Sequence, residues 1–122
     1  MMARILIVDD SLIMRRNLKM IFVAAGHTVV AEASNGRDAI NEYQQHHPDV
    51  VTMDITMPVM DGIESARKII ELDSAARIVM ISALDQRHMV FEALENGAKH
   101  YILKPFQGEQ VLEVVDQVLK ME

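Results

Sequence analysis

The chain has 122 residues, half of them apolar and a quarter charged, which is the composition of a globular domain and excludes a disordered or fibrous protein. Its formal net charge of -6 argues against the large basic surface with which proteins contact the phosphates of nucleic acids, so we expect no direct binding of nucleic acid. The sequence has no cysteine, which excludes disulfides and thiolate metal sites, and no apolar run long enough for a signal peptide or a membrane span. We therefore expect a cytoplasmic protein that does not associate with membranes.

Five short runs of aliphatic and β-branched residues predict β-strands. They cover residues 4–8, 28–33, 49–53, 77–82 and 100–104. Runs such as RILIV and RIVMIS are apolar throughout, which is typical of strands that are buried on both faces of a parallel sheet.

Segments of helical length follow each of these runs. The first helix should begin at Ser11, a favoured N-cap residue, and end at Gly26. Its apolar residues should form one buried stripe: Ile13, Met14, Leu18, Ile21, Phe22 and Ala25. The other helices are expected between Gly36 and His47, and over residues 62–72, 85–96 and 107–121.

The alternation of five strands with five helices predicts the α/β class, with a parallel sheet covered by helices on both faces. No linker, low-complexity tract or repeat interrupts the pattern, so we expect one domain over residues 1–122. With right-handed crossovers, the most plausible arrangement is a flavodoxin-like, doubly wound (βα)5 fold with strand order 2-1-3-4-5.

Polar residues follow the strands that should lie at and beyond the middle of this sheet. They are, in chain order, Asp9 and Asp10, then Asp54, then Ser82, which Ala83 follows, and then Lys104, which Pro105 follows. In folds of this kind, ligands bind beyond the carboxyl ends of the strands, at the switch point between strands 1 and 3. Three acids, a hydroxyl and an ammonium group should therefore meet in one crevice.

Three carboxylates in one crevice repel each other, since two like charges about 4 Å apart cost about 4 kcal/mol at an effective dielectric near 20. Lys104 supplies one positive charge, but its strand should lie apart from strand 1. A divalent cation is therefore the more natural partner of Asp9 and Asp10. An oxygen-only ligand set, without Cys or His nearby, favours Mg²⁺ together with a phosphate oxygen.

Asp54 is then interpreted as a nucleophile, because aspartyl carboxylates can form acyl phosphates. Mg²⁺, Lys104, and the Ser82 hydroxyl with the Ala83 backbone amide would each stabilise an oxygen of the transferred phosphoryl group. Taken singly, an acid at a strand end is more often a helix cap or turn residue, and a lysine is more often solvated. Only the combination indicates a site for phosphoryl transfer.

These motifs resemble the receiver domains of bacterial two-component response regulators. The resemblance rests on ILIVDDS, DVVTMDITMPVMDGI, VMISA and NGAKHYILKPF, and it covers essentially the whole chain. Because the chain ends with the fifth helix, it is most similar to the stand-alone chemotaxis type, the CheY-like receivers, whose strand order is known to be 2-1-3-4-5. A receiver excised from a longer transcriptional or enzymatic regulator stays open as an alternative.

The resemblance implies that Asp54 accepts a phosphoryl group from a phosphohistidine on a sensor histidine kinase. Asp10 and Asp54 would bind Mg²⁺ together with the backbone carbonyl of Thr56, and Asp9 would act mainly through water. Lys104 would contact the phosphoryl oxygens, as would the backbone amide of Ala83.

The resemblance also implies a switch and an output surface. Lys104 and Pro105 would be joined by a cis peptide bond, and Ser82 and Tyr101 match a pair in which the hydroxyl moves toward the phosphate while the ring turns inward. A target protein would bind the face made by helix 4, strand 5 and helix 5. The expected apolar contacts on that face are Met89, Val90, Leu94, Tyr101, Val114 and Met121.

A receiver of this type is not a conventional enzyme, because it catalyses only its own phosphorylation and dephosphorylation. We expect a monomer, with dimerisation on phosphorylation left open.

Three other functions stay open. An aspartyl phosphotransferase acting on exogenous substrates requires a second acid at the position of Thr56. A flavin-binding electron carrier requires a phosphate-binding loop after the first strand, where Asp9 and Asp10 would repel the flavin phosphate. An unphosphorylated interaction module predicts a missing site residue, and none is missing.

Overall fold

The structure, a computed structural model, describes residues 2–121 apart from the side chain of Leu84. Its five strands form one parallel sheet in the order β2-β1-β3-β4-β5, which confirms the predicted α/β class and strand order. The strands are β1 (Arg4–Val8), β2 (Thr28–Ala33), β3 (Val50–Asp54), β4 (Ile78–Ser82) and β5 (His100–Leu103).

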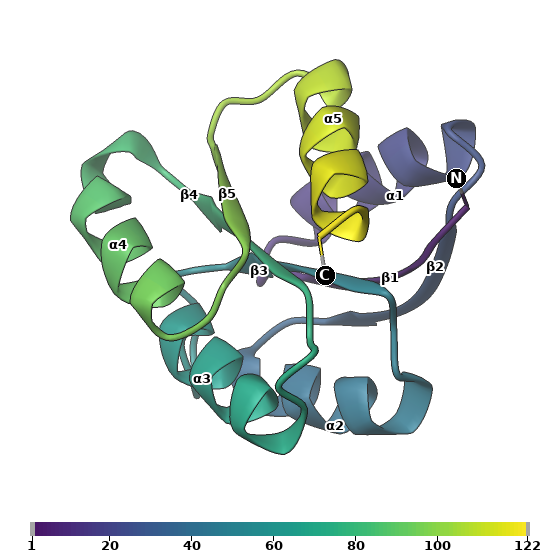
Figure 1. The fold of residues 1–122 in the computed structure, drawn as a ribbon. Helices are drawn as coiled ribbons and strands as arrows, with labels where there is room; N and C mark the ends of the chain where they lie inside the picture. Colours follow the sequence, from purple (N-terminus) through teal and green to yellow (C-terminus); the bar gives the residue numbers. More distant parts are fainter. Residues whose placement is uncertain (1, 122) are drawn as a thin grey trace.

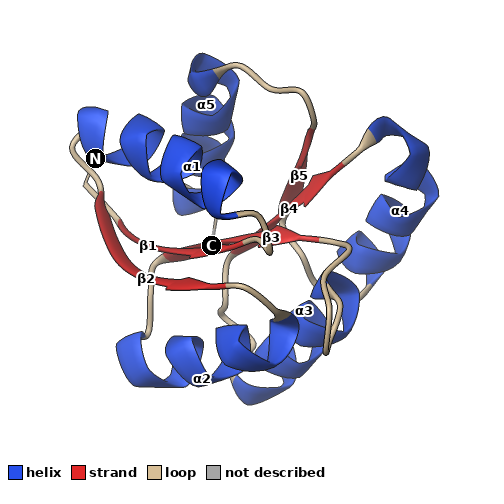
Figure 2. Cartoon of the chain, turned by 180° about the vertical axis from the view of Figure 1, so that it is seen from behind, coloured by secondary structure: helices blue, strands red, loops and turns tan. Residues whose placement is uncertain are grey.

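The helices cover both faces of the sheet, with α1 and α5 on one face and α2, α3 and α4 on the other (Figures 1 and 2). They are α1 (Leu12–Ala24), α2 (Gly36–His46), α3 (Gly62–Leu72), α4 (Arg87–Glu95) and α5 (Gly108–Leu119). The fourth helix begins two residues later than expected, because residues 84–86 form a separate 3-10 turn, η1 (Leu84–Gln86). This turn lies directly after the end of β4 and carries a residue that becomes important at the site.

Two apolar cores lie on either side of the sheet, because successive residues of a strand point to opposite faces. In β1, Ile5 and Ile7 pack under α1 and α5, while Leu6 and Val8 pack under α2, α3 and α4. Strands β3 and β4 are buried along their whole length, whereas the edge strand β2 is mostly half-buried. The strands that carry the acidic residues and Ser82 are therefore held from both faces.

The predicted stripe on α1 is wrong at two positions. Leu18 and Phe22 are buried, but Ile13 is 82% exposed and Ala25 is also exposed. On a helix with 100° per residue, Ile13 lies about 140° away from Leu18, so it cannot share the same buried face. The buried face of α1 is narrower than the sequence pattern suggested.

The loop between β3 and α3 contains one residue with an unfavourable backbone. Val59 has a φ of 70° and its side chain is 74% exposed. The left-handed region costs an L-residue roughly 1–2 kcal/mol, and a β-branched side chain is among the least suited to it. The rest of this loop, which follows the phosphoacceptor candidate Asp54, must therefore hold Val59 in place.

We expect Val59→Asn to raise the free energy of unfolding by about 1 kcal/mol, because asparagine tolerates the left-handed conformation. Urea denaturation of both proteins measures the difference. Val23→Asn is a suitable control, since Val23 is an exposed valine in the ordinary backbone of α1 and should show no gain. A loss of stability in the Val59 variant would contradict the assignment of strain to this position.

Candidate functional site

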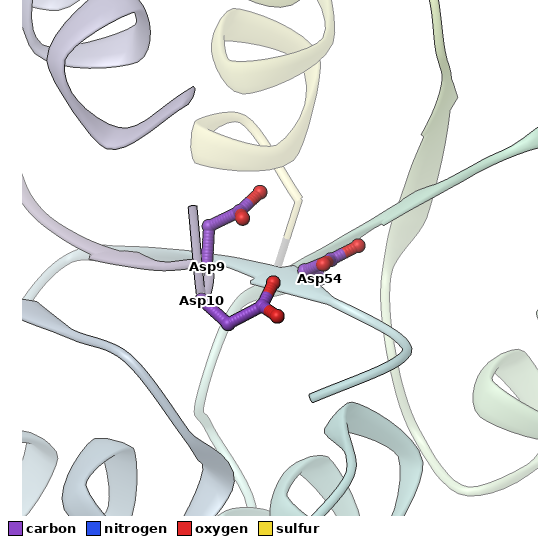
Figure 3. A group of neighbouring side chains, drawn as sticks. All are labelled: Asp9, Asp10 and Asp54. Atoms are coloured by element: carbon purple, nitrogen blue, oxygen red, sulfur yellow. The ribbon is translucent and has the colours of Figure 1, made fainter. Parts of the chain in front are cut away.

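The carboxyl edge of the sheet brings three acids together (Figure 3). Asp9 and Asp10 follow β1, and Asp54 is the last residue of the neighbouring strand β3. Each offers a carboxylate oxygen, and these atoms lie within 4.8 Å of one another. The side chains expected to form the acidic cluster are thus close enough to share a ligand.

Lys104 lies against two of these acids. Its Nζ is 3.4 Å from an oxygen of Asp9 and 3.3 Å from Oδ1 of Asp54. The strand before Lys104 lies apart from β1 in the sheet, as expected, but the side chain of Lys104 still contacts Asp9. A long, flexible lysine side chain spans the distance between β5 and β1, and Lys104 bridges the two buried carboxylates.

Asp9 and Asp10 differ in their surroundings. Asp9 is only 1% exposed, and besides Lys104 it accepts a hydrogen bond of 2.8 Å from the backbone N–H of Ser11. The guanidinium of Arg15 donates to the backbone carbonyl of Asp9 at 2.7 Å. Asp9 is thus fixed in place by several contacts, whereas Asp10 is exposed at the mouth of the site.

Asp54 is 6% exposed, and its surroundings penalise its negative charge. Burial, followed by repulsion from Asp9 and a smaller repulsion from Asp10, raises the pKa of Asp54 to about 6, although Lys104 opposes the shift. The backbone N–H of Ile55 also donates to Asp54 Oδ1 at 3.1 Å. A second cation near Asp54 would relieve the charge that Lys104 leaves uncompensated.

The donor set of the cluster fits a hard divalent cation. Asp9, Asp10 and Asp54 supply oxygen atoms only, and carboxylate oxygens with remaining positions for water suit Mg²⁺. Thr56, two residues after Asp54, lines a groove of about 630 Å³ between α3 and α4 that opens beside the β3–α3 loop. The residues present are therefore compatible with a metal site at the carboxyl edge.

Ser82 ends β4 with its hydroxyl buried. Its side-chain oxygen has no hydrogen-bond partner among the residues that the structure describes. Leaving a buried hydroxyl unpaired costs about 1–3 kcal/mol, so an acceptor or donor arriving beside it would be favoured. Its position next to Asp54's strand makes a phosphoryl oxygen a suitable partner.

Gln86 is the site residue that the sequence argument missed. Its side-chain oxygen accepts a hydrogen bond of 3.0 Å from the backbone N–H of Ala83, and its side-chain nitrogen donates to the hydroxyl of Thr56. A lone glutamine in a loop carries no distinctive signal in the sequence. Its role becomes visible only once the 3-10 turn places it between the ends of β3 and β4.

The segment after β5 is tied to the end of β4. The backbone N–H of Lys104 donates to the carbonyl of Ser82 at 2.8 Å, and the Lys104–Pro105 peptide bond is cis. Tyr101, which belongs to β5, is 38% exposed. It lines a small pocket together with Val90 and Phe91 of α4, so it is partly open to solvent in this structure.

The face expected to bind a partner is only partly available. Tyr101 and Met121 are exposed, and Met89 and Leu94 are half-buried. Val90 and Val114 are buried, and each packs into one of the two cores, although Val90 also lines a small pocket on this face. The exposed apolar side chain of α4 is Phe91, at 69%, which sequence reasoning did not select. Phe91, Tyr101 and Arg87 line a small pocket of 40 Å³ on this face.

Among residues 2–121, none of the helices combines the length and apolar character needed to cross a membrane.

The protein is similar over almost its whole length to chemotaxis proteins named CheY. It is 53% identical to CheY of Bacillus subtilis over 116 residues, covering 95% of this chain and 97% of that protein. It is 49% identical to CheY of Thermotoga maritima, covering 96% and 98% of the two chains. This chain and these two relatives therefore match along nearly their whole lengths.

Solved structures give the same result. The chain superposes on CheY in the CheX-CheY-BeF3-Mg+2 complex from Borrelia burgdorferi with a TM-score of 0.92 and 41% identity, covering 97% of this chain and 90% of that one. It matches the response regulator domain of Thermotoga maritima CheB with a TM-score of 0.90 and 34% identity, covering 100% and 99%. The sequence profile of the response regulator receiver domain matches residues 5–116. The chain therefore belongs to the family of response regulator receiver domains.

Proposed function

We propose that this protein is a stand-alone, CheY-like response regulator and that residues 1–122 form a single domain. We also propose that phosphorylation of Asp54 activates it. The observation that carries the proposal is the position of Asp54. Its carboxylate lies at the end of a buried strand, 3.3 Å from the ammonium of Lys104 and within 4.8 Å of two further acids. Positive side chains and bound metal ions both stabilise the charge of a phosphoryl group during its transfer, and these groups place a cation and a metal-binding cluster beside one nucleophile.

In the proposed reaction, an oxygen of Asp54 forms a bond to phosphorus. The P–N bond of the donor phosphohistidine breaks, and its electron pair stays on the imidazole nitrogen, while a proton from solvent keeps the ring neutral. With acetyl phosphate as donor, the P–O bond breaks and acetate leaves. Either way the product is an acyl phosphate on Asp54, and the protein is a substrate of the reaction more than a conventional enzyme.

Asp10, Asp54 and the backbone carbonyl of Thr56 would hold Mg²⁺, with Asp9 acting through water. When bound, Mg²⁺ supplies positive charge that offsets the negative charge of the phosphoryl oxygens. Lys104 would release the carboxylate of Asp54 and contact another of the phosphoryl oxygens instead. The Ser82 hydroxyl and the Ala83 amide would bind a third, which gives the unpaired hydroxyl of Ser82 an acceptor.

Ser82 and Tyr101 would form the switch of this regulator. Movement of the Ser82 hydroxyl toward the phosphoryl group would leave space behind it, and the Tyr101 ring, now 38% exposed, would turn into that space. Phosphorylation would in this way change the surface of α4, β5 and α5 without contacting it directly.

The proposed partners follow from this mechanism. A sensor histidine kinase would supply the phosphoryl group, and a target protein would bind the surface formed by α4, β5 and α5. The CheY of Borrelia burgdorferi is in a complex with CheX, and a partner of that kind is one candidate here. We propose a cytoplasmic, monomeric protein that also catalyses the loss of its own phosphoryl group.

Incubation with Mg²⁺ and acetyl phosphate, followed by intact mass spectrometry, tests the proposal. We expect the wild type to gain one phosphoryl group and Asp54→Asn to gain none, because the amide is not a nucleophile for phosphorus. Asp116→Asn, which changes an exposed acid of α5, should be labelled like the wild type. A wild type that stays unmodified, under conditions that label another receiver domain, would overturn the proposal.

A further inference from the structure

The side chain of Gln86 connects the two loops that enclose the phosphoryl site. Gln86 is the last residue of η1 and directly precedes α4. Its carboxamide oxygen accepts from the N–H of Ala83 at 3.0 Å, and its carboxamide nitrogen donates to the hydroxyl of Thr56. Both polar atoms of the side chain are therefore in use, one toward the end of β4 and one toward the loop after β3.

The first of these contacts conflicts with phosphorylation. In the proposed function, the N–H of Ala83 donates to an oxygen of the phosphoryl group on Asp54. In the structure this N–H already has an acceptor, Gln86 Oε1, at ordinary hydrogen-bond length. A backbone N–H makes one good hydrogen bond at a time, so the phosphoryl oxygen and the glutamine oxygen must compete for it.

We propose that Gln86 is a latch that occupies the phosphoryl-binding amide of Ala83 before phosphorylation and is displaced by the phosphoryl group. This proposal rests on the proposed function, because it gives Gln86 a role in the same site. Gln86 is a positioning residue and not a catalytic one, since it contacts the Ala83 amide and Thr56 and takes no part in bond formation.

Before phosphorylation, the Ala83 N–H donates to Gln86. Once the phosphoryl group is attached, its oxygen is the stronger acceptor for this N–H. A hydrogen bond to an ionised oxygen is about twice as strong as one between neutral groups. Displacement of Gln86 is therefore energetically favourable in the phosphorylated protein. Before phosphorylation, the hydrogen bond between Gln86 and Ala83 must be broken, and this cost slows the reaction with the donor. Since a neutral hydrogen bond contributes about 0.5–1.5 kcal/mol net, the latch should slow phosphorylation by roughly two- to tenfold.

Release of Gln86 would also change the loops on both sides. Its nitrogen would leave the Thr56 hydroxyl, so the β3–α3 loop would lose its connection to η1. Because the next residue, Arg87, begins α4, the first turn of that helix would lose an anchor at the same time. Gln86 thus connects events at Asp54 to the helix that carries Met89 and Phe91.

Two substitutions separate a latch from a residue that merely stabilises the loop. Gln86→Met keeps the length of the side chain but removes its acceptor, and we expect phosphorylation by acetyl phosphate to become about two- to tenfold faster. Gln86→Glu keeps an acceptor for the Ala83 amide, and we expect phosphorylation slower than in the wild type. Gln110→Met, at an exposed position of α5, is the matched control and should react like the wild type.

Nuclear magnetic resonance of the metal-free protein gives a readout independent of the reaction. The Ala83 amide proton should move upfield in Gln86→Met, which has no acceptor, and downfield in Gln86→Glu, whose ionised oxygen is the stronger acceptor. In the wild type, Mg²⁺ with beryllofluoride, a stand-in for the phosphoryl group, should shift the Gln86 side-chain NH₂ signals to those of a solvated carboxamide.

The latch is overturned if the wild type is phosphorylated but Gln86→Met and Gln86→Glu change the rate in the same direction or not at all. It is also overturned if the Gln86 signals do not move when beryllofluoride binds. A wild type that takes no phosphoryl group overturns the proposed function and the latch together, so the two failures are distinguishable.

Discussion

Replacing Gly62 with alanine is expected to lower the free energy of unfolding by about 1–3 kcal/mol, the typical range when atoms are forced into a packed interior. Gly62 is the first residue of α3, and a Cβ there would overlap the carbonyl oxygen of Asp54. It would also lie 2.9 Å from the carbonyl carbon of Asp54 and 3.0 Å from Cγ of Met53. The overlap is with the backbone of the buried strand β3, which has little room to move away.

Gly108→Ala is a matched control, because Gly108 is the first residue of α5. The three atoms nearest to a Cβ at Gly108 all belong to Ile21 and lie at 3.5 Å or more, so alanine should be tolerated or slightly stabilising. Urea denaturation of both variants measures the contrast. Because Gly62→Ala pushes on the backbone of the phosphoacceptor itself, labelling by acetyl phosphate should fall as well. Equal stability of the two variants would show that the β3–α3 loop relaxes without cost.

The fold could be predicted because its signals are local and repeat. Each strand is a short apolar run, and the N-cap residues Ser11, Asn35 and Asp61 each accept a backbone hydrogen bond at the start of a helix. The site could be predicted in outline for a topological reason, since the ends of neighbouring parallel strands meet at one edge. The prediction that Asp9, Asp10 and Asp54 lie together therefore did not depend on the conformations of their side chains.

What the sequence did not predict depends on side-chain reach and direction. The separation of the strands made a divalent cation the expected partner of Asp9, and the contact of Asp9 with Lys104 was not predicted, because it depends on the reach of a lysine side chain. Val90 was expected on the partner surface, while the exposed residue is its neighbour Phe91, because a shift of one residue turns a helical side chain by 100°. The contact of Gln86 with Ala83 depends on a 3-10 turn for which the sequence carries no signal.

Removing the negative charge of Asp54 is expected to stabilise the protein. In the absence of divalent cations, at about pH 7.5, Asp54→Asn should raise the free energy of unfolding by about 1–3 kcal/mol. The reason is that the carboxylate is buried beside Asp9, and the bond to Lys104 compensates only part of the cost. Lys104 keeps Asp9 as a partner in the variant.

The gain should depend on pH in a direction set by the raised pKa of Asp54, about 6 in the folded protein against an ordinary value of 3.8. Below its ordinary pKa, the carboxyl is protonated in both the folded and unfolded states and costs nothing. As pH rises through the folded pKa, the unfolded state has already lost its proton, so wild-type stability falls relative to the variant. The difference between the two proteins should therefore be small near pH 4 and reach its full size above pH 6.

Urea denaturation of the wild type and Asp54→Asn across this pH range, with and without Mg²⁺, measures both effects. Glu113→Gln, an exposed acid of α5, is the control and should change stability by less than about 0.5 kcal/mol. Saturating Mg²⁺ should stabilise the wild type more than the variant, because a ligand that binds the folded state stabilises it and the variant lacks one carboxylate. If Asp54→Asn is less stable than the wild type above pH 6 without metal, Lys104 more than compensates the buried charge, and the electrostatic strain inferred for this site is wrong.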